Sequence, residues 1–366
     1  MKSSPKILII GSTGKLGSRL LSFCKKKHIK IFAITGYKNK KKLKLQKKQY
    51  SINNSFLLSD DIDENKFKKF LNLNFIDLIY FLDYGYNSII YSDIFLKKNI
   101  NSIIAIANKE MIIAGGNLLI DKIVRSNNKL IPLDSEHFSL FNLNLKKFDI
   151  KKIYITASGG PFYFNKKTNL NRVNLKNVLS HPKWKMGINN SIDSSNFVNK
   201  LLEIYELSII YNISLDKIDF LVSSEAYIHS VVINNDNVIN INCFDNNMLI
   251  TLIKPLHKHY PNLSLPYKNY YFDPNKLNLQ KFNDKRFKIF KYISILKKLS
   301  HSEQISFMIL NNIAQKKYLS SEIKYNNIID YIMSNLKKIK FKSNFKSFND
   351  IINFINSIKY KHDNKT

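Results

Sequence analysis

Three glycines, Gly11, Gly14 and Gly17, separate an apolar run from an amphipathic segment, and this feature constrains the fold most. Lys6–Ile10 predicts a buried strand, and Lys15–Lys26 predicts a helix. Glycines at this spacing permit a tight turn that lets the backbone approach a pyrophosphate, which the helix N-terminus then binds. The strand–loop–helix context favours a dinucleotide site, although a glycine-rich turn without a ligand remains an alternative.

Apolar runs and amphipathic segments continue to alternate after this loop, and this βαβ rhythm predicts a doubly wound parallel sheet of the Rossmann type. Its further strands are expected at Ile29–Thr35, Phe75–Leu82 and Ile103–Ala107, and Leu130–Leu133 forms another short apolar strand. Residues 38–49 are a lysine-rich loop or helix surface. A second α/β region has strands near Ile153–Ala157, Phe220–Val222 and Ile228–Ile233.

Helical spacing dominates from about residue 286, which predicts a C-terminal helical bundle. Its helices are expected at Phe287–Leu299, Ser302–Tyr318, Tyr325–Leu336 and Phe348–Ile358. A polar stretch with three prolines precedes it and predicts a linker. The expected organisation is a dinucleotide-binding domain at 1–130, a second α/β domain at 131–257, a linker at 258–285 and a helical domain at 286–366.

The formal net charge of +31 suggests nucleic acid or an anionic membrane as a partner. However, the basic residues are nearly all lysine, with arginine only at positions 19, 125, 172 and 286. Lysine, asparagine, isoleucine, phenylalanine and tyrosine all have AT-rich codons, so genome composition explains the charge without a ligand. We expect neither a nucleic-acid nor a membrane partner, since arginine is the usual choice for base and phosphate readout.

The cysteine count and the hydropathy pattern bear on the compartment. Cys24 and Cys243 are too few for a disulfide framework, which favours a reducing cytoplasm. No apolar run approaches the length of about 18 residues that a membrane span needs. The first predicted strand begins almost at once, so a secretory or transit segment is not expected.

The end of the second predicted strand bears on cofactor choice. Enzymes that use NAD usually place an acidic residue there, where it binds the ribose hydroxyls. This chain instead has Thr35-Gly36-Tyr37-Lys38-Asn39, which is neutral to basic. The pattern therefore favours the 2′-phosphate of NADP.

Two groups of carboxylates suggest a metal site. Asp134 and Glu136 follow the strand Leu130–Leu133 at i and i+2, a spacing that points both side chains to one side. Hard oxygen ligands suit Mg²⁺ or Mn²⁺. Taken alone, this pair also fits a solvated turn.

The segment Ser191–Tyr211 adds a third carboxylate on a predicted helix. Asn199, Lys200 and Glu203 are three and four residues apart, so they share one helical face. A surface salt bridge is the alternative for this pair of charges. Ser194, near the start of this helix, is positioned to cap it or to bind phosphate.

Two loops carry further candidates. The segment 181–187 holds Trp184, the only tryptophan, in a polar loop, where it would serve as a lid over a ligand. Ser158-Gly159-Gly160 follows a strand and presents a hydroxyl and backbone N–H groups to an anion. Either segment is also compatible with a simple turn.

Together these blocks resemble the 1-deoxy-D-xylulose 5-phosphate reductoisomerase family. The matching blocks run in the family's order through the first two-thirds of the chain: GSTGKLG (11–17), ANKE (107–110), PLDSEH (132–137), ITASGGPF (155–162), HPKWKMG (181–187), SIDSSNFVNKLLE (191–203) and IHS (228–230). The C-terminal part fits the family only in outline. The resemblance implies a homodimer that acts on a phosphorylated sugar with NADPH and Mg²⁺ or Mn²⁺. It implies that residues 1–130 bind NADPH and that residues 131–257 form the catalytic, metal- and substrate-binding domain, with a flap near 181–190.

The resemblance also assigns roles to residues. It implies that Asp134, Glu136 and Glu203 are the metal ligands. It implies catalytic roles for Lys109, Glu136, His137, His181 and His229. The implied substrate contacts are Lys109, Ser135, Glu136, Ser158, His181, Trp184, Ser194, Asn199, Lys200 and Glu203. The implied NADPH contacts are Gly11, Thr13, Gly14, Lys15, Leu16, Gly36, Lys38, Asn39, Asn108, Glu110, Met186 and Gly187.

The implied reaction is the rearrangement and reduction of 1-deoxy-D-xylulose 5-phosphate to 2-C-methyl-D-erythritol 4-phosphate, a step of non-mevalonate isoprenoid biosynthesis. Departures from the family's pattern occur at Ile188-Asn189, Ser223–Glu225, Asp245–Met248 and Leu310–Ala314. They predict an active enzyme that is slow and weakly stable. The rival interpretations are another NADP-dependent enzyme, such as a semialdehyde or homoserine dehydrogenase, and an inactive basic binding protein.

Overall fold

The computed structural model describes residues 4–141, 143, 145, 150–180, 187–264, 273–342 and 344–363. These residues form two compact units, and neither unit is continuous in sequence. The first unit comprises residues 1–142 and 247–271, and the second comprises 143–246 and 272–366. The predicted domain ends at residues 130 and 257 therefore differ from the boundaries of these units, which follow residues 142, 246 and 271. The predicted division by function stays a prediction.

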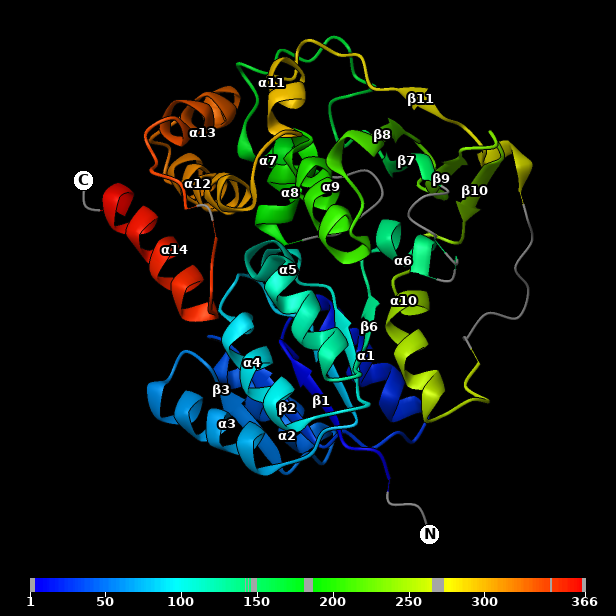
Figure 1. Cartoon of the computed structure of the whole chain (residues 1–366), viewed down its shortest axis with the longest axis vertical. Helices are drawn as coiled ribbons and strands as arrows, with labels where there is room; N and C mark the ends of the chain where they lie inside the picture. Colours follow the sequence, from blue (N-terminus) through cyan, green and yellow to red (C-terminus); the bar gives the residue numbers. More distant parts are fainter. Residues whose placement is uncertain are drawn as a thin grey trace. The chain divides into compact units, whose positions relative to one another are not determined.

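A six-stranded parallel sheet forms the centre of the first unit, in the order β3-β2-β1-β4-β5-β6 (Figure 1). Its strands are β1 (Ile7–Ile10), β2 (Ala33–Gly36), β3 (Asn54–Leu57), β4 (Leu78–Phe81), β5 (Ile103–Ile106) and β6 (Lys129–Pro132). The order reverses between β1 and β4, and ligands of such sheets bind beyond the strand ends at this point. The predicted doubly wound sheet is therefore confirmed.

Helices cover both faces of this sheet because its strands bury alternate residues on opposite sides. The helices are α1 (Lys15–Lys26), α2 (Lys40–Gln49), α3 (Asp61–Leu73), α4 (Ser88–Lys98), α5 (Lys109–Arg125), α6 (Ser135–Phe141) and α10 (Leu249–Ile253). Ile7, Ile9 and Tyr80 belong to one buried cluster with α1 and with Leu252 of α10. The Tyr80 hydroxyl also donates a hydrogen bond of 2.8 Å to the Leu252 carbonyl oxygen. Residues far along the chain thus complete the first core.

The second unit contains a five-stranded mixed sheet in the order β10-β9-β7-β8-β11. Its strands are β7 (Ile150–Ala157), β8 (Ile218–Val222), β9 (Ile228–Asn234), β10 (Ile239–Cys243) and β11 (Gln280–Lys281). Strands β7 and β8 are parallel, whereas β9, β10 and β11 pair antiparallel with their neighbours. Strand β11 lies inside the predicted linker, where one short ladder with β8 provides its pairing.

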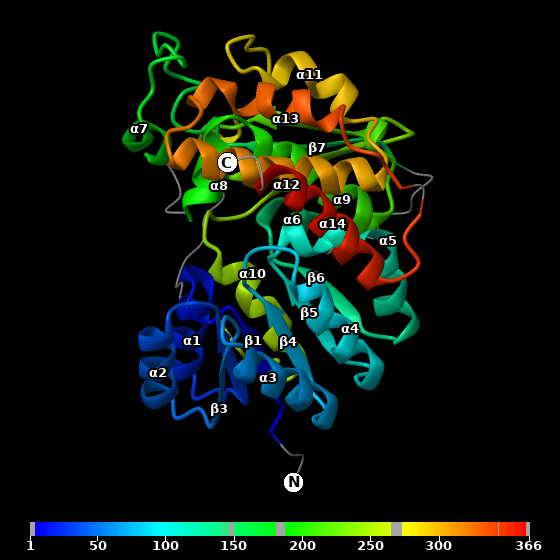
Figure 2. The ribbon, with the colours of Figure 1, turned by 90° about the vertical axis from the view of Figure 1, so that its left-hand side faces the viewer.

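The remaining helices of the second unit are α7 (Leu175–Leu179), α8 (Ile188–Ser195), α9 (Val198–Tyr211), α11 (Ile289–Leu296), α12 (His301–Leu319), α13 (Ile328–Leu336) and α14 (Phe348–Asp363). Among the described residues, four short 3₁₀ helices occur, at Leu215–Lys217, Lys254–Lys258, Pro274–Lys276 and Tyr325–Asn327. Helix α12 packs against both α13 and α14 (Figure 2). The predicted C-terminal helical bundle is confirmed. Within the described ranges, none of the helices is long and apolar enough to cross a membrane.

Candidate active site

The glycine loop after β1 is shaped by two close backbone approaches. Gly11 has φ of +82°, and a Cβ atom there would lie 2.6 Å from the Asp83 nitrogen. A Cβ atom on Gly17 would lie 2.5 Å from the Ser12 Cα atom. Gly14 precedes α1 without a side-chain cap, which leaves the N-terminus of that helix open to an anion. Thr13, Lys15 and Leu16 complete this turn and the first residues of the helix.

The end of β2 borders the same loop. A Cβ atom on Gly36 would lie 2.9 Å from Thr13 Cγ2, so Gly36 contacts the loop directly. Asn39 caps α2, because its side chain accepts a hydrogen bond of 2.9 Å from the Lys42 nitrogen. The Lys42 ammonium donates to the Thr13 carbonyl oxygen at 2.7 Å. Sequence analysis named Lys38 and missed Lys42, because the contact of Lys42 with the loop depends on how α2 packs and not on local spacing.

Two buried carboxyl groups lie at the ends of β4 and β5. Burial raises the pKa of Asp83, and the hydrogen bond of 2.6 Å from Ser88 opposes that rise only in part. Burial also raises the pKa of Glu110, against the opposing charge of Lys109. Asn108 caps α5 and donates a hydrogen bond to the Gly85 carbonyl oxygen at 2.8 Å. In both cases burial disfavours the charged form of the carboxyl group.

Asp134, Ser135 and Glu136 stand where β6 passes into α6. The Lys109 ammonium forms an ion pair of 3.3 Å with Asp134, and both side chains are largely buried. The Ser135 hydroxyl donates to the Glu136 carboxylate at 2.5 Å. The Asp134 carbonyl oxygen accepts from the Phe138 nitrogen, so this residue already begins the helix. The prediction that Asp134 and Glu136 point to one side is confirmed, because their carboxylate oxygens lie within 4.8 Å of each other, but a helix start rather than strand alternation brings them together.

His137 and His229 lie in different units. His137 is fully buried in α6 of the first unit. His229 is buried in β9 of the second unit, where its ring stacks on Phe244 with centroids 3.9 Å apart. Its Nε2 atom lies 3.3 Å from the Phe244 carbonyl oxygen. Their predicted catalytic roles remain predictions.

The face of α9 predicted to carry three functional groups is confirmed. The Lys200 ammonium lies 2.5 Å from one Glu203 oxygen, and the Asn199 amide donates to the other. Glu203 is 2% exposed and Lys200 is 8% exposed. The alternative of a solvated surface salt bridge is therefore wrong. A buried carboxylate requires such partners, because its desolvation is otherwise costly.

Ser194 belongs to α8, which corrects the prediction that it begins the helix carrying Asn199. Helix α8 ends at Ser195, and the chain then turns through Phe197, whose φ is +66°, into α9. A turn of this kind is not visible in helical periodicity, since Phe197 is not a residue that usually adopts positive φ. Between residues 191 and 207, only Ser194 and Asn199 are partly exposed. Those two side chains are thus the most exposed ones in this segment.

The turn after β7 packs against the end of α8. Ser158 is half-buried there, and Gly159 and Gly160 follow with φ of +87° and +59°. A Cβ atom on Gly160 would lie 2.9 Å from the Ser194 carbonyl oxygen. The structure therefore brings the turns that carry Ser158 and Ser194 together within the second unit.

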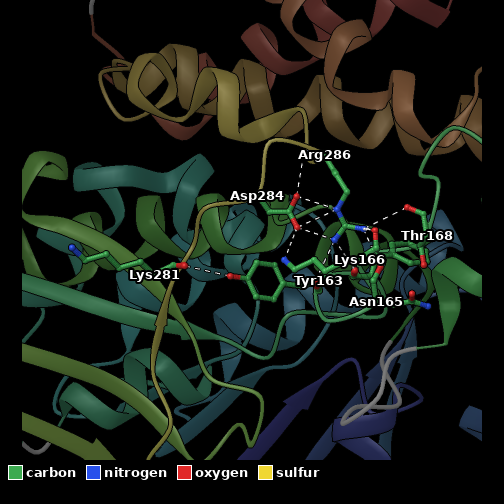
Figure 3. Close-up of polar contacts among 8 residues, drawn as sticks. Tyr163, Asn165, Lys166, Thr168, Lys281, Asp284 and Arg286 are labelled. Carbon is green, nitrogen blue, oxygen red and sulfur yellow. Dashed lines mark hydrogen bonds and ion pairs between the residues drawn. The ribbon is translucent and has the colours of Figure 1, made fainter.

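Arg286 fixes the loop that continues from this turn (Figure 3). Its guanidinium donates to the carbonyl oxygens of Phe162, Tyr163, Asn165, Lys166 and Thr168 and to the Asp284 carboxylate. Burial alone would raise the pKa of Asp284, but hydrogen bonds from Arg286 and Lys166 lower it from 3.8 to about 2. One ion pair thus organises a loop distant in sequence. Sequence analysis did not single out this pair.

The segment predicted to form the flap is only partly described. His181, Trp184 and Met186 lie outside the described residues. Gly187 is exposed and stands directly before α8. The lid role of Trp184 therefore stays a prediction.

A glycine-loop parallel sheet combined with a second unit rich in buried polar groups defines a dinucleotide-dependent enzyme. Residues 130–211 match the family model of the 1-deoxy-D-xylulose 5-phosphate reductoisomerase C-terminal domain. The reductoisomerase of Pelagibacter ubique is 35% identical over 350 residues, which span 88% of each chain. The reductoisomerase of Francisella tularensis subsp. holarctica is 29% identical and spans 90% of this chain and 91% of its own.

Solved structures show the same fold. The reductoisomerase of Zymomonas mobilis, in complex with NADPH, superimposes with a TM-score of 0.82 at 22% identity, over 98% of both chains. A second reductoisomerase, in complex with NADPH, fosmidomycin and magnesium, gives a TM-score of 0.83 at 19% identity, over 98% of this chain and 96% of its own. The chain belongs to the 1-deoxy-D-xylulose 5-phosphate reductoisomerase family. It is an oxidoreductase of that family, and the rival assignments to other dehydrogenases or to a binding protein are set aside.

Proposed function

We propose that this chain converts 1-deoxy-D-xylulose 5-phosphate to 2-C-methyl-D-erythritol 4-phosphate with NADPH and either Mg²⁺ or Mn²⁺. The match to the Pelagibacter enzyme along 88% of both chains carries this proposal. NADPH supplies the hydride and binds at the β1–α1 loop, and the end of β2 favours the 2′-phosphate. Gly11, Gly14 and Gly36 allow the close approach that the cofactor needs, and Lys42 adds positive charge.

Asp134, Glu136 and Glu203 are the proposed ligands of the divalent cation. Their carboxylate oxygens are the hard donors that Mg²⁺ and Mn²⁺ prefer. A bound cation supplies Lewis-acid polarisation of the substrate oxygens. In the structure, lysine ammonium groups accompany two of these carboxylates, at Asp134 and at Glu203. Each ammonium group compensates part of the negative charge that the carboxylates would otherwise bring together.

Ser158, Ser194, Asn199 and Lys200 are the proposed contacts of the substrate phosphate and hydroxyls. The packing of Gly160 on the end of α8 supports this assignment, because it holds two hydroxyl-bearing turns together. Ser194 and Asn199 are the partly exposed positions of their segment. A phosphate bound there supplies remote binding energy that positions the reacting end of the substrate.

Lys109 and Ser135 are proposed to act at the reacting end. Lys109 is 6% exposed and held by Asp134, so its ammonium is oriented before substrate arrives. The Ser135 hydroxyl is oriented in the same way by Glu136. Orientation of this kind removes entropy from the barrier before reaction. Met186, Trp184, His181, His137 and His229 retain their predicted roles as part of this proposal.

A homodimer in the cytoplasm completes the proposal, with neither nucleic acid nor membrane as a partner. Strand β10 supports the dimer, because it is an edge strand whose Ile239 and Ile241 are 59% and 46% exposed. Cys24 and Cys243 are both free thiols, which supports a reducing compartment.

The direct test is NADPH oxidation on addition of 1-deoxy-D-xylulose 5-phosphate and Mn²⁺ to the purified protein. We expect activity that disappears after dialysis against EDTA and returns with Mg²⁺ or Mn²⁺. A protein that fails to oxidise NADPH with every divalent cation tried would refute the proposed function.

A further inference from the structure

Helix α8 contains only eight residues, so its intrinsic helical stability is low. Helices shorter than about 12 residues are marginal in water, so tertiary contacts must fix them. Gly187, the residue before α8, provides no side-chain cap, and the first turn contains no acidic residue that would favour the helix dipole. The placement of Ser194 therefore depends on what holds α8 from outside.

Two amides of α12 hold α8 through a buried carboxylate. Asp193 is 3% exposed, and its oxygens accept hydrogen bonds of 2.9 and 3.1 Å from Asn311 Nδ2. Gln315 Nε2 donates to the same carboxylate at 2.5 Å and to the Asn189 carbonyl oxygen at 3.2 Å. Asn311 and Gln315 are four residues apart and thus lie on one face of α12. Hydrogen bonds to a charged group are among the strong ones, so this contact sets the position of α8.

A second contact fixes the end of the same helix. The Ser195 hydroxyl donates to the Tyr325 hydroxyl at 3.1 Å, in a fully buried setting. Burial raises the pKa of Tyr325 well above its ordinary value, so the phenol stays protonated. Asp193 and Ser195 flank Ser194, which is the partly exposed residue of the three. Since helical residues are offset by about 100°, anchoring its two neighbours fixes the direction of the Ser194 side chain.

We propose that Asn311 and Gln315 are positioning residues for the reaction. They hold Asp193 and thereby fix the rotation of α8, so that the Ser194 hydroxyl meets the substrate phosphate. This inference rests on the proposed phosphate role of Ser194, and it assigns a function to a stretch of α12 whose sequence departs from the family's pattern. Loss of either amide should weaken phosphate binding more than NADPH binding, because the glycine loop of the proposed cofactor site lies in the first unit.

The first test compares Gln315→Leu with Gln304→Leu. Both substitutions remove a buried amide of α12, but Gln304 donates to the Leu299 carbonyl oxygen at 2.9 Å and does not contact α8 in any described hydrogen bond. We expect both variants to lose thermal stability to a similar degree. Only Gln315→Leu should raise the KM for 1-deoxy-D-xylulose 5-phosphate, by about tenfold, with the Kd of NADPH changed less than about twofold. Equal KM values in the two variants would overturn the inference.

The second test is an exchange of partners. Asn311→Asp places two carboxylates together and should raise KM by more than about tenfold. The double variant Asp193→Asn with Asn311→Asp restores one amide and one carboxylate, and the new amide oxygen at position 193 is still available to Gln315. We expect it to recover KM to within about threefold of the wild type. Failure of the exchange to improve on Asn311→Asp would count against the positioning role.

Calorimetric binding of 1-deoxy-D-xylulose 5-phosphate to the NADP⁺- and Mg²⁺-loaded protein separates this inference from the proposed function. If the wild-type protein and Gln315→Leu bind the substrate with the same Kd, the inference is contradicted and the proposed function is not. Wild-type protein that neither binds nor turns over the substrate contradicts both.

Discussion

The Glu203 carboxylate accepts hydrogen bonds from Asn199 and Lys200 on one face of α9, and it is almost completely buried, unlike acidic residues on the surface. An exposed carboxylate needs no partner, whereas this one is bound by an amide and an ammonium. Sequence spacing predicted that shared face correctly, because helical geometry fixes residues three and four apart. Burial could not be predicted, since it depends on residues remote in sequence that cover the helix.

Glu203→Gln keeps the size and the hydrogen-bonding capacity of the side chain but removes its charge. If Glu203 is a metal ligand, kcat should fall by roughly 10²–10³, which corresponds to several kcal/mol of lost Lewis-acid stabilisation. The Kd of NADPH, measured by fluorescence titration, should stay unchanged. Glu322→Gln is the control, because it neutralises an acid in a surface ion pair with Lys317 of the same unit and should leave kcat unaffected. Retention of full activity in Glu203→Gln would remove this residue from the metal site.

Asp284 makes a pH-dependent contribution to stability. Its pKa is about 2 in the folded protein and near 3.8 when unfolded, so the carboxylate stabilises the fold above about pH 4. That contribution is lost as pH falls from about 4 toward 2, because the unfolded chain binds the proton first. The free energy of unfolding in urea should therefore differ most between wild type and Asp284→Asn at about pH 5, and less at about pH 3. A difference that is constant over this range would contradict the assignment.

At the scale of elements, the β1–α1 loop shows how glycine fixes a turn. The strand and the helix of this unit were predicted closely, and α1 matches its predicted bounds. The contact of Gly17 with Ser12 could be expected from the glycine spacing alone. Strand β2 begins at Ala33 rather than at Ile29, because pairing with β1 rather than apolar composition decides where a strand starts.

Gly17→Ala should damage the nucleotide loop because the new Cβ atom would lie 2.5 Å from a backbone atom of Ser12. Forcing the loop apart costs about 1–3 kcal/mol in an overpacked site. We expect at least about tenfold weaker NADPH binding, with the circular dichroism spectrum retained. Ser22→Ala, on the exposed side of α1, is the control and should bind NADPH normally. Unchanged affinity in Gly17→Ala would place the cofactor elsewhere.

Other elements were not predicted from the sequence. Helix α3 begins at an Asp60 cap followed by three acidic residues, a signal that was available and not used. Strand β11 has two residues and exists because β8 offers an edge, which no local pattern reveals. Helices α8 and α9 are separate because Phe197, between them, has a positive φ. Tertiary packing imposes this conformation.

At the scale of the whole molecule, the proposed homodimer can be tested by measuring the mass of the protein in solution. If β10 joins a second copy, light scattering after size exclusion should give twice the monomer mass of 42.8 kDa. Ile239→Asp with Ile241→Asp should shift the protein toward the monomer, since both side chains are exposed on an edge strand. Lys151, exposed in β7, provides a control position for an unrelated surface substitution. A wild-type monomer at micromolar concentration would contradict the proposed dimer.

The net charge was the least informative sequence feature for predicting the function of the whole molecule. The surplus of +31 would by itself suggest a nucleic-acid partner, yet the family match requires none. The motifs were the more informative part of the chain, because each places several chemical groups at fixed spacing. Composition averages over the surface and therefore cannot locate a site.

The return of the chain to its first unit at residue 247 has a consequence for biosynthesis. Leu252 and Leu256 complete the first core, yet a ribosome synthesises them roughly a hundred residues after β6. At about 5–20 residues per second, the nascent sheet waits on the order of 5–20 s with apolar surface uncovered. A chaperone that recognises exposed apolar strands would therefore find this protein during translation, and fragments ending near residue 142 should aggregate when expressed alone.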